Sequence, residues 1–298
     1  VNLTENTIDE LVDKTMEDYL KTVGGRDVLK TLEFEFAYRE MAKTLKILLK
    51  YMVLQFKNSD FVPDAFELNI NSKDGSVPSL VLEFNKGEKL SLSGQIDRVD
   101  VLKLEDGREL VRVIDYKTGS KEFHLSDVLY GQNLQMLIYL YILCKVEGSP
   151  YAGMEPAGIL YMPSKRGTAT QSSSNSLAMN GMILNDSDVI TAMDKSGEGK
   201  FVFKPPKSER LGNPTITGED FSVVFDFLEN KLKETAKHIK GGIFDLTPCD
   251  GRTDSACKYC DFKTVCAATE DLEHSYVEGA YPTEIINKMK EAKGYGMD

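Results

Sequence analysis

The sequence has little from which a membrane segment, an ATP site or a general nucleic-acid surface is built. No apolar run approaches the roughly 20 residues that cross a bilayer. No Gly-x-x-x-x-Gly-Lys-Ser/Thr loop occurs in the 298 residues, so ATP hydrolysis is not expected of them. The net charge of −11 also argues against a general nucleic-acid binder, because phosphate neutralisation requires clustered lysine and arginine.

Histidine and cysteine are scarce and unevenly placed. The three histidines are His124, His238 and His274, and no cysteine precedes Cys144. The other four cysteines lie between positions 249 and 266, a distribution more typical of a metal site than of a secreted disulfide framework. With 41% hydrophobic and 28% charged residues, the composition is that of a globular protein, which we expect in the cytoplasm.

Residues 94–119 are the most informative stretch that is present. Apolar and polar residues alternate over residues 89–101, which predicts a half-buried strand. Residues 105–108 are typical of a turn, and the β-branched residues 110–116 predict a second strand. If the two strands pair across this turn, Asp97 lies opposite Asp115, and Lys117 projects from the same face as Asp115.

Two carboxylates and an ammonium at this place suit the binding of a hard divalent cation beside a phosphodiester. Buried charge is costly unless it is paired or coordinated, so these residues indicate function more than packing. Asp97 and Asp115, with the backbone carbonyl of Tyr116, are the expected ligands of Mg²⁺ or Mn²⁺. Lys117 is expected to orient a water or to stabilise charge in the transition state. The alternative is an ordinary ion pair on two solvated strands.

The next segment, residues 125–145, is predicted to be a single helix. Gln135 and Tyr139 share one face of it, one turn apart, within an otherwise apolar run. We expect them to position the active-site groups or a nucleic-acid strand. The alternative places the glutamine on an exposed stripe and the tyrosine at the edge of the core.

The predicted elements indicate one α/β domain without repeats or an interdomain linker. Its parts are a helical region over residues 1–60, a strand-rich core over 61–240 and a cysteine-containing tail over 241–298. The order of helices and strands predicts a mixed central sheet flanked by helices.

Three motifs in order, Gly94-x-Ile-Asp97, Asp115-Tyr-Lys117 and Gln135-x-x-x-Tyr139, resemble those of the RecB-type branch of the PD-(D/E)xK nucleases. The tail resembles the iron–sulfur staple of the AddB family of helicase–nuclease subunits. The resemblance implies a restriction-endonuclease-like core with a cysteine-bearing C-terminal extension, in which these acids, the lysine, the glutamine and the tyrosine are catalytic. It also implies an Mg²⁺-dependent DNA exonuclease that processes double-strand break ends for recombinational repair, with single-stranded DNA ends and an AddA-like subunit as partners.

The cysteine tail allows two kinds of metal site. Four thiolates suffice for tetrahedral zinc or for an iron–sulfur cluster, and the chain offers Cys249, Cys257, Cys260 and Cys266. The resemblance assigns the last three to a 4Fe–4S cluster, takes the fourth ligand from upstream and leaves Cys249 as an extra thiol.

The chain departs from the family in lacking that upstream cysteine and the family's metal-binding histidine, which lies in an early Gly-x-x-x-His segment. We therefore expect a fragment of a longer polypeptide. In this fragment the cluster is expected to be absent or incomplete, and the isolated nuclease is expected to be weak or inactive.

Two other functions share these features. One is a CRISPR-associated or stand-alone RecB-family exonuclease, which has the same motifs. The other is a catalytically silent DNA-binding or structural module, against which the intact Asp97, Asp115 and Lys117 argue, because a degenerate site usually loses one of them.

Overall fold

The computed structural model describes residues 4–25, 31–71, 73, 76–119, 122–164, 177–244, 248–251, 257–258, 260–266 and 275–294. Its helices are α1 (Glu5–Thr22), α2 (Leu32–Lys57), α3 (Leu125–Leu129), α4 (Gln135–Lys145), α5 (Ser187–Met193), α6 (Gly218–Gly241), α7 (Lys263–Cys266) and α8 (Pro282–Gly294). Its strands are β1 (Val62–Ile70), β2 (Leu80–Asn85), β3 (Glu88–Leu92), β4 (Gly94–Lys103), β5 (Glu109–Lys117), β6 (Glu155–Pro163), β7 (Asn180–Leu184), β8 (Thr215–Ile216), β9 (Cys249–Asp250) and β10 (Ser275–Tyr276).

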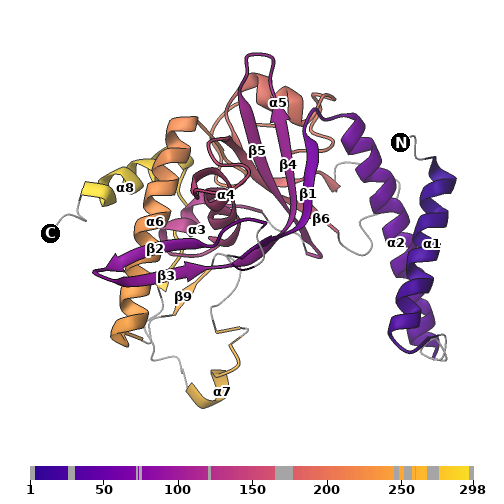
Figure 1. The fold of residues 1–298 in the computed structure, drawn as a ribbon, viewed down its shortest axis with the longest axis horizontal. Helices are drawn as coiled ribbons and strands as arrows, with labels where there is room; N and C mark the ends of the chain where they lie inside the picture. The colour runs from indigo at the N-terminus through magenta and orange to yellow at the C-terminus, as the bar shows by residue number, and fades with distance from the viewer. Residues whose placement is uncertain are drawn as a thin grey trace.

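A six-stranded sheet in the order β1-β4-β5-β6-β7-β8 forms the centre of the molecule (Figure 1). The pairs β5–β6 and β7–β8 are parallel and the other three are antiparallel. The sheet is therefore mixed, and helices flank it, which confirms the predicted α/β fold class.

Helices α4 and α6 cover one face of this sheet. Helix α4 packs on β5 and β6, and α6 packs on α4. The strands facing these helices are fully buried at Val113 and Ile159, as is Leu137 of α4. Their long apolar runs are typical of a sheet that is covered on both faces.

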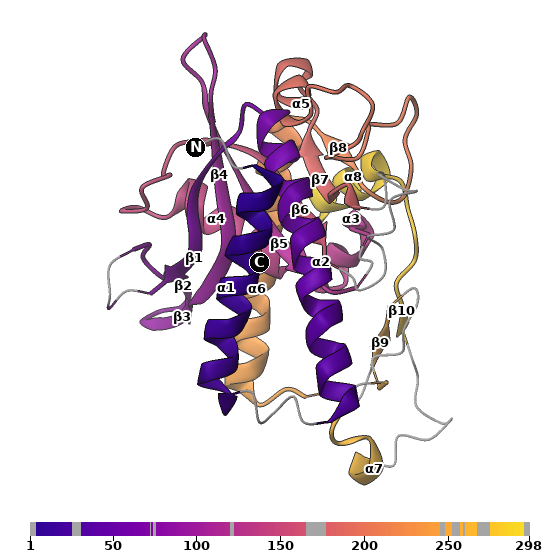
Figure 2. The same cartoon turned by 90° about the vertical axis from the view of Figure 1, so that its right-hand side faces the viewer.

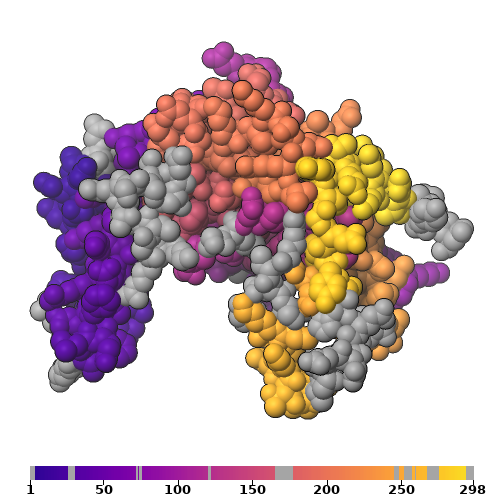
Figure 3. All heavy atoms as spheres, turned by 180° about the vertical axis from the view of Figure 1, so that it is seen from behind, coloured from indigo at the N-terminus to yellow at the C-terminus, as the bar shows by residue number. Residues whose placement is uncertain are grey.

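Helices α1 and α2 form an antiparallel hairpin with a small apolar seam of its own (Figure 2). Ile8, Val12 and Met16 of α1 pack against α2, and Lys46 reaches across to Asp13 at 2.7 Å. The C-terminal end of α2 meets the sheet. In Figure 3 this hairpin and the cysteine-bearing tail project from the body on either side of an open notch. None of the described helices has the length and apolarity needed to cross a bilayer.

Two predicted elements are divided in the structure. The strand expected over residues 89–101 breaks at Ser93: β3 pairs with β2 as a separate hairpin, whereas β4 enters the central sheet between β1 and β5. The helix expected over 125–145 breaks into α3 and α4, because Gly131 and Asn133 adopt left-handed backbone conformations, with φ of 74° and 55°.

Candidate active site

Strands β4 and β5 bring the two predicted acids together at the ends farthest from their connecting turn. Arg98 pairs with Ile114 in the antiparallel register, so the next residues outward, Asp97 and Asp115, lie across from each other. The Asp97 carboxylate accepts a hydrogen bond from the backbone N–H of Tyr116, with an O···N distance of 2.9 Å. A side chain of β4 is thereby fixed between Asp115 and Lys117 in sequence.

Asp115 and Lys117 point to the same side of β5, as their spacing predicts. The Lys117 Nζ atom lies 2.7 Å from Asp115 Oδ2. Asp115 is only 7% exposed, and its neighbour in the parallel register on β6 is the buried Tyr161. The lysine ammonium lies 5.9 Å from the centre of the Tyr161 ring, within the range of a cation–π contact. The lysine is thus held over a buried acid and an aromatic face.

Tyr116 faces the opposite side of the sheet. Burial raises the pKa of its hydroxyl, while its hydrogen bond to Arg98 and the charge of that guanidinium act in the other direction. Backbone atoms of Tyr116 therefore belong to the candidate site, whereas its side chain belongs to the buried layer behind it.

Helix α4 supplies the second half of the site. The Gln135 side chain donates a hydrogen bond to the Tyr139 hydroxyl at 3.2 Å, so the two residues lie on one face as predicted. Gln135 is exposed and Tyr139 is half-buried. A methyl group at Gly94, the first residue of β4, would lie 2.8 Å from the Tyr139 ring and hydroxyl. Glycine at this position is what allows the tyrosine to approach the strand that carries Asp97.

The carboxylates fit a hard divalent cation. Asp115 Oδ2 is buried and accepts no well-oriented hydrogen bond within the described part of the chain, although the Lys117 ammonium is close enough for an ion pair. No group of three or more His, Cys, Asp or Glu side chains that could hold a metal occurs among the described residues. Mg²⁺, however, commonly takes only one or two carboxylates and completes its shell with water and substrate phosphate.

The four tail cysteines are all described, and no disulfide joins any two of them. Cys260 and Cys266 are exposed, and Cys249 and Cys257 are half-buried. No three of these thiols converge in the described residues. The tail in this structure therefore does not have the geometry of a zinc or iron–sulfur site.

Two groups of polar residues around the site were not predicted from the sequence. Arg98, Asp100 and Arg112 form a buried ion-pair network behind β4 and β5. Asp127 of α3 accepts a hydrogen bond from Asn133 at 2.5 Å, just before α4 begins. Its charge and that of Asp115 add to burial in raising the pKa of the Tyr161 hydroxyl. The one signal in the sequence was the alternation of charged residues with valine from position 97 to 101, which is unusual on a core strand.

Comparison with known proteins agrees with this arrangement. A family model described as the PD-(D/E)XK nuclease superfamily matches residues 2–267. An ATP-dependent helicase/deoxyribonuclease subunit of Alkaliphilus metalliredigens is 29% identical over 308 residues, which cover 97% of this chain and 27% of that protein. The protein of the same name from Clostridium kluyveri is 30% identical over 280 residues, 88% of this chain and 24% of that protein. The chain thus spans about a quarter of the length of these relatives. The described fold and the match over nearly its whole length show that this chain belongs to the PD-(D/E)XK nuclease superfamily.

Proposed function

We propose that this chain is a metal-dependent nuclease domain that hydrolyses phosphodiester bonds in DNA, with its active centre at Asp97, Asp115 and Lys117. The observation that supports this most is the contact between the Asp97 carboxylate and the Tyr116 N–H, which lies within the segment joining Asp115 to Lys117. Three charged groups from two strands thereby occupy one end of the sheet.

In this proposal, Asp97 and Asp115 hold Mg²⁺ or Mn²⁺, together with the backbone carbonyl of Tyr116. The bound cation supplies Lewis acidity and a more acidic water. Lys117 orients the attacking water or stabilises the charge that develops on the phosphate. Asp115 and the ring of Tyr161 limit the positions open to the lysine, so its ammonium is pre-placed before substrate binds.

Gln135 and Tyr139 have the role of positioning the DNA strand or the lysine. Their hydrogen bond lies at the start of α4, and Tyr139 rests against Gly94 at the start of β4. The exposed amide of Gln135 is available to a phosphate or a base, while the half-buried tyrosine fixes its orientation.

We further propose that these residues form the nuclease domain of a larger helicase/deoxyribonuclease subunit. The relatives that carry this name extend far beyond the matched region. In such a complex, an AddA-like partner would deliver single-stranded DNA ends, and the domain would degrade them as an exonuclease during the repair of double-strand breaks. A 4Fe–4S cluster on Cys257, Cys260 and Cys266 would need a fourth ligand and a rearrangement of the tail described above.

The test is degradation of end-labelled single-stranded DNA with Mg²⁺ or Mn²⁺, in this chain and in the longer polypeptide that the proposal requires. Asp97→Asn and Asp115→Asn are expected to abolish degradation. Asp106→Asn is the matched control, because Asp106 is an exposed acid in the turn at the other end of the same strand pair. Full activity of the Asp115→Asn protein would refute the assignment.

A further inference from the structure

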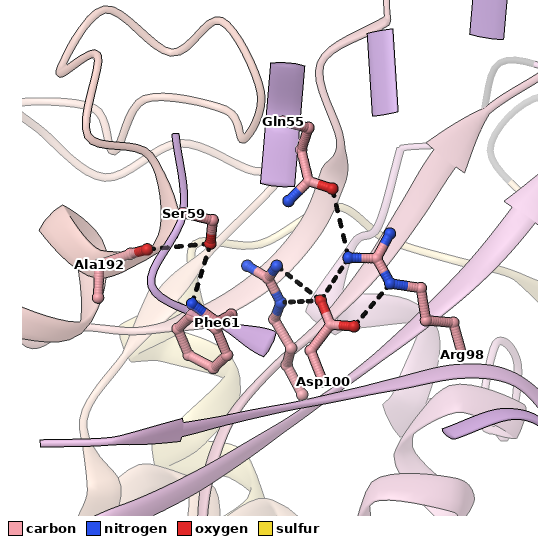
Figure 4. A network of polar contacts seen from close by, with 7 residues as sticks. Gln55, Ser59, Phe61, Arg98, Asp100 and Ala192 are labelled. Carbon is pink, nitrogen blue, oxygen red and sulfur yellow. Dashed lines mark hydrogen bonds and ion pairs between the residues drawn. The ribbon is translucent and has the colours of Figure 1, made fainter. Parts of the chain in front are cut away.

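A fully buried network of charged residues lies behind the candidate site (Figure 4). Arg98 donates two hydrogen bonds to the Asp100 carboxylate, both at 2.6 Å. Arg112 donates two more to Asp100 Oδ2, at 3.0 and 2.7 Å. Arg98 also reaches Gln55 at the end of α2, at 3.3 Å. Arg98, Asp100, Arg112 and Gln55 are all 0% exposed.

This network is expensive if its only role is to stabilise the fold. Two guanidiniums and one carboxylate leave one positive charge without a partner within the set, and replacing buried ion pairs by apolar residues is often neutral or stabilising. The Nη1 atoms of Arg98 and Arg112 and the Nε2 atom of Gln55 have no hydrogen-bond partner in the described structure. Both arginines are stacked on aromatic rings, Arg98 on Phe56 at 4.6 Å and Arg112 on Phe61 at 4.2 Å. The guanidiniums are thus tightly held.

The two arginines share one partner but differ in their distance along the strands from the site. Arg98 directly follows Asp97, and its guanidinium hydrogen-bonds the Tyr116 side chain. It therefore contacts the residue whose backbone N–H binds Asp97. Arg112 lies three residues before Asp115, pairs in register with Asp100 and packs on Phe61. Only Arg98 joins both sides of the Asp97–Tyr116 contact.

We propose that Arg98 is a positioning residue that holds Asp97 and the backbone of Tyr116 in register for cation binding. This inference rests on the proposed function, because it assigns Asp97 as a metal ligand. Asp100 anchors the guanidinium, and Gln55 and Phe56 fix it to α2. Residues that orient metal ligands in this way typically change metal affinity or activity about 10- to 100-fold when they are replaced.

The test compares Arg98→Met with Arg112→Met. Each variant removes one buried guanidinium and leaves a neutral pair of one arginine with Asp100, so the two changes in charge and burial are matched. We expect Arg98→Met to raise the Mn²⁺ concentration for half-maximal DNA cleavage at least about 10-fold, with much of the rate recovered at high Mn²⁺. Arg112→Met is expected to keep the wild-type Mn²⁺ midpoint.

A second readout does not depend on activity. In the metal-free protein, hydrogen exchange of the Tyr116 amide is expected to accelerate in Arg98→Met but not in Arg112→Met, because the Asp97 acceptor becomes mobile. Should Arg98→Met fail to fold, Arg98→Lys replaces it, since it keeps the charge and loses the two-pronged contact with Asp100. Equal Mn²⁺ midpoints and equal Tyr116 exchange in the Arg98 and Arg112 variants would overturn the proposal.

Gln55→Glu separates position from charge, because it adds a carboxylate to the network and brings its formal charge to zero. The positioning role predicts a Mn²⁺ midpoint like that of the wild type. A shift as large as that of Arg98→Met would show that the network acts through its charge and would contradict the proposal. If instead Asp115→Asn cleaves DNA normally, the proposed function fails; if Asp115→Asn is inactive and the arginine variants are alike, only the role of Arg98 fails.

Discussion

The carboxylate of Asp97 binds the backbone N–H of Tyr116 at 2.9 Å, and this contact joins the two strands at the point where their regular pairing ends. The described ladder stops at Arg98 and Ile114, and a side chain supplies the next acceptor. The acid is thereby held by the backbone that also carries Asp115 and Lys117. Small shifts of either strand therefore move both carboxylates relative to each other.

Replacement of Lys117 is expected to affect the rate of cleavage more than DNA binding. Lys117→Met keeps most of the side-chain volume and removes the ammonium, so we expect kcat to fall about 10²- to 10³-fold. The affinity for single-stranded DNA, measured by fluorescence anisotropy in Ca²⁺, is expected to change little. Lys103→Met is the control, because Lys103 is an exposed lysine at the far end of β4. A loss of binding that accounts for the whole loss of activity would contradict this role.

Gly94→Ala is expected to displace Tyr139. The added methyl would lie 2.8 Å from two atoms of the tyrosine, and such overpacking costs about 1–3 kcal/mol. The loss of stability and of cleavage should be much smaller in a Tyr139→Ala background, which removes the clash. A double-mutant cycle on urea unfolding and on cleavage rate measures this coupling. Additive effects would show that Gly94 and Tyr139 act independently.

The sequence contains enough information to predict the juxtaposition of the acids but not the path of the chain around them. The turn at residues 105–108 and the alternation of β4 fix the register of the strand pair. The same alternation continues from Leu90 and Leu92 into β4, so it cannot reveal that the pairing partner changes at Ser93. Periodicity reports which face is buried and carries no information about the neighbouring strand.

The helix and the buried network escaped prediction for different physical reasons. Apolar periodicity runs through Gly131 and Asn133, although both adopt left-handed conformations that end one helix before the next begins. Arg98 and Arg112 carry charges that usually mark exposed positions. Their burial depends on Asp100 and on α2, which the chain brings from about 40 residues upstream, and no local pattern announces that contact.

Asp100→Asn tests the stability that the buried network provides. Burial alone would raise the pKa of Asp100, but the charges and hydrogen bonds of Arg112 and Arg98 outweigh it, so the pKa is lowered. A carboxylate with a lowered pKa stabilises the fold above its unfolded-state pKa of about 4, and this contribution is lost as the pH falls through the folded-state value. We expect Asp100→Asn to cost about 3–5 kcal/mol at neutral pH, because it leaves two buried guanidiniums without a carboxylate.

Urea unfolding of both proteins as a function of pH measures this effect. The difference in unfolding free energy between wild type and Asp100→Asn should be constant from pH 7 to about pH 5 and shrink below about pH 4. A difference that grows on acidification would contradict the sign of the pKa shift.

The cysteines are expected to fall into two classes of reactivity. Burial raises the pKa of the Cys144 thiol to about 12, so it should react with an alkylating reagent only when the chain unfolds. Cys260 and Cys266 are exposed and should react in the folded protein. Mass spectrometry of timed alkylation distinguishes them. Anaerobic reconstitution with iron and sulfide that protects Cys257, Cys260 and Cys266 together would support the cluster proposal, whereas unchanged alkylation would show that this chain alone does not assemble it.

The proposed function depends above all on Asp97 and Asp115 sharing one divalent cation beside Lys117. Crystals of the chain grown with Mn²⁺ and a short single-stranded DNA, measured at the manganese absorption edge, test this directly. We predict one strong anomalous peak in contact with an oxygen of each carboxylate, at about the 2.1 Å expected of small octahedral cations. In crystals of Asp115→Asn the peak should be lost or much weakened. A well-occupied manganese elsewhere on the bound DNA phosphate, with both carboxylates unliganded, would contradict the assignment.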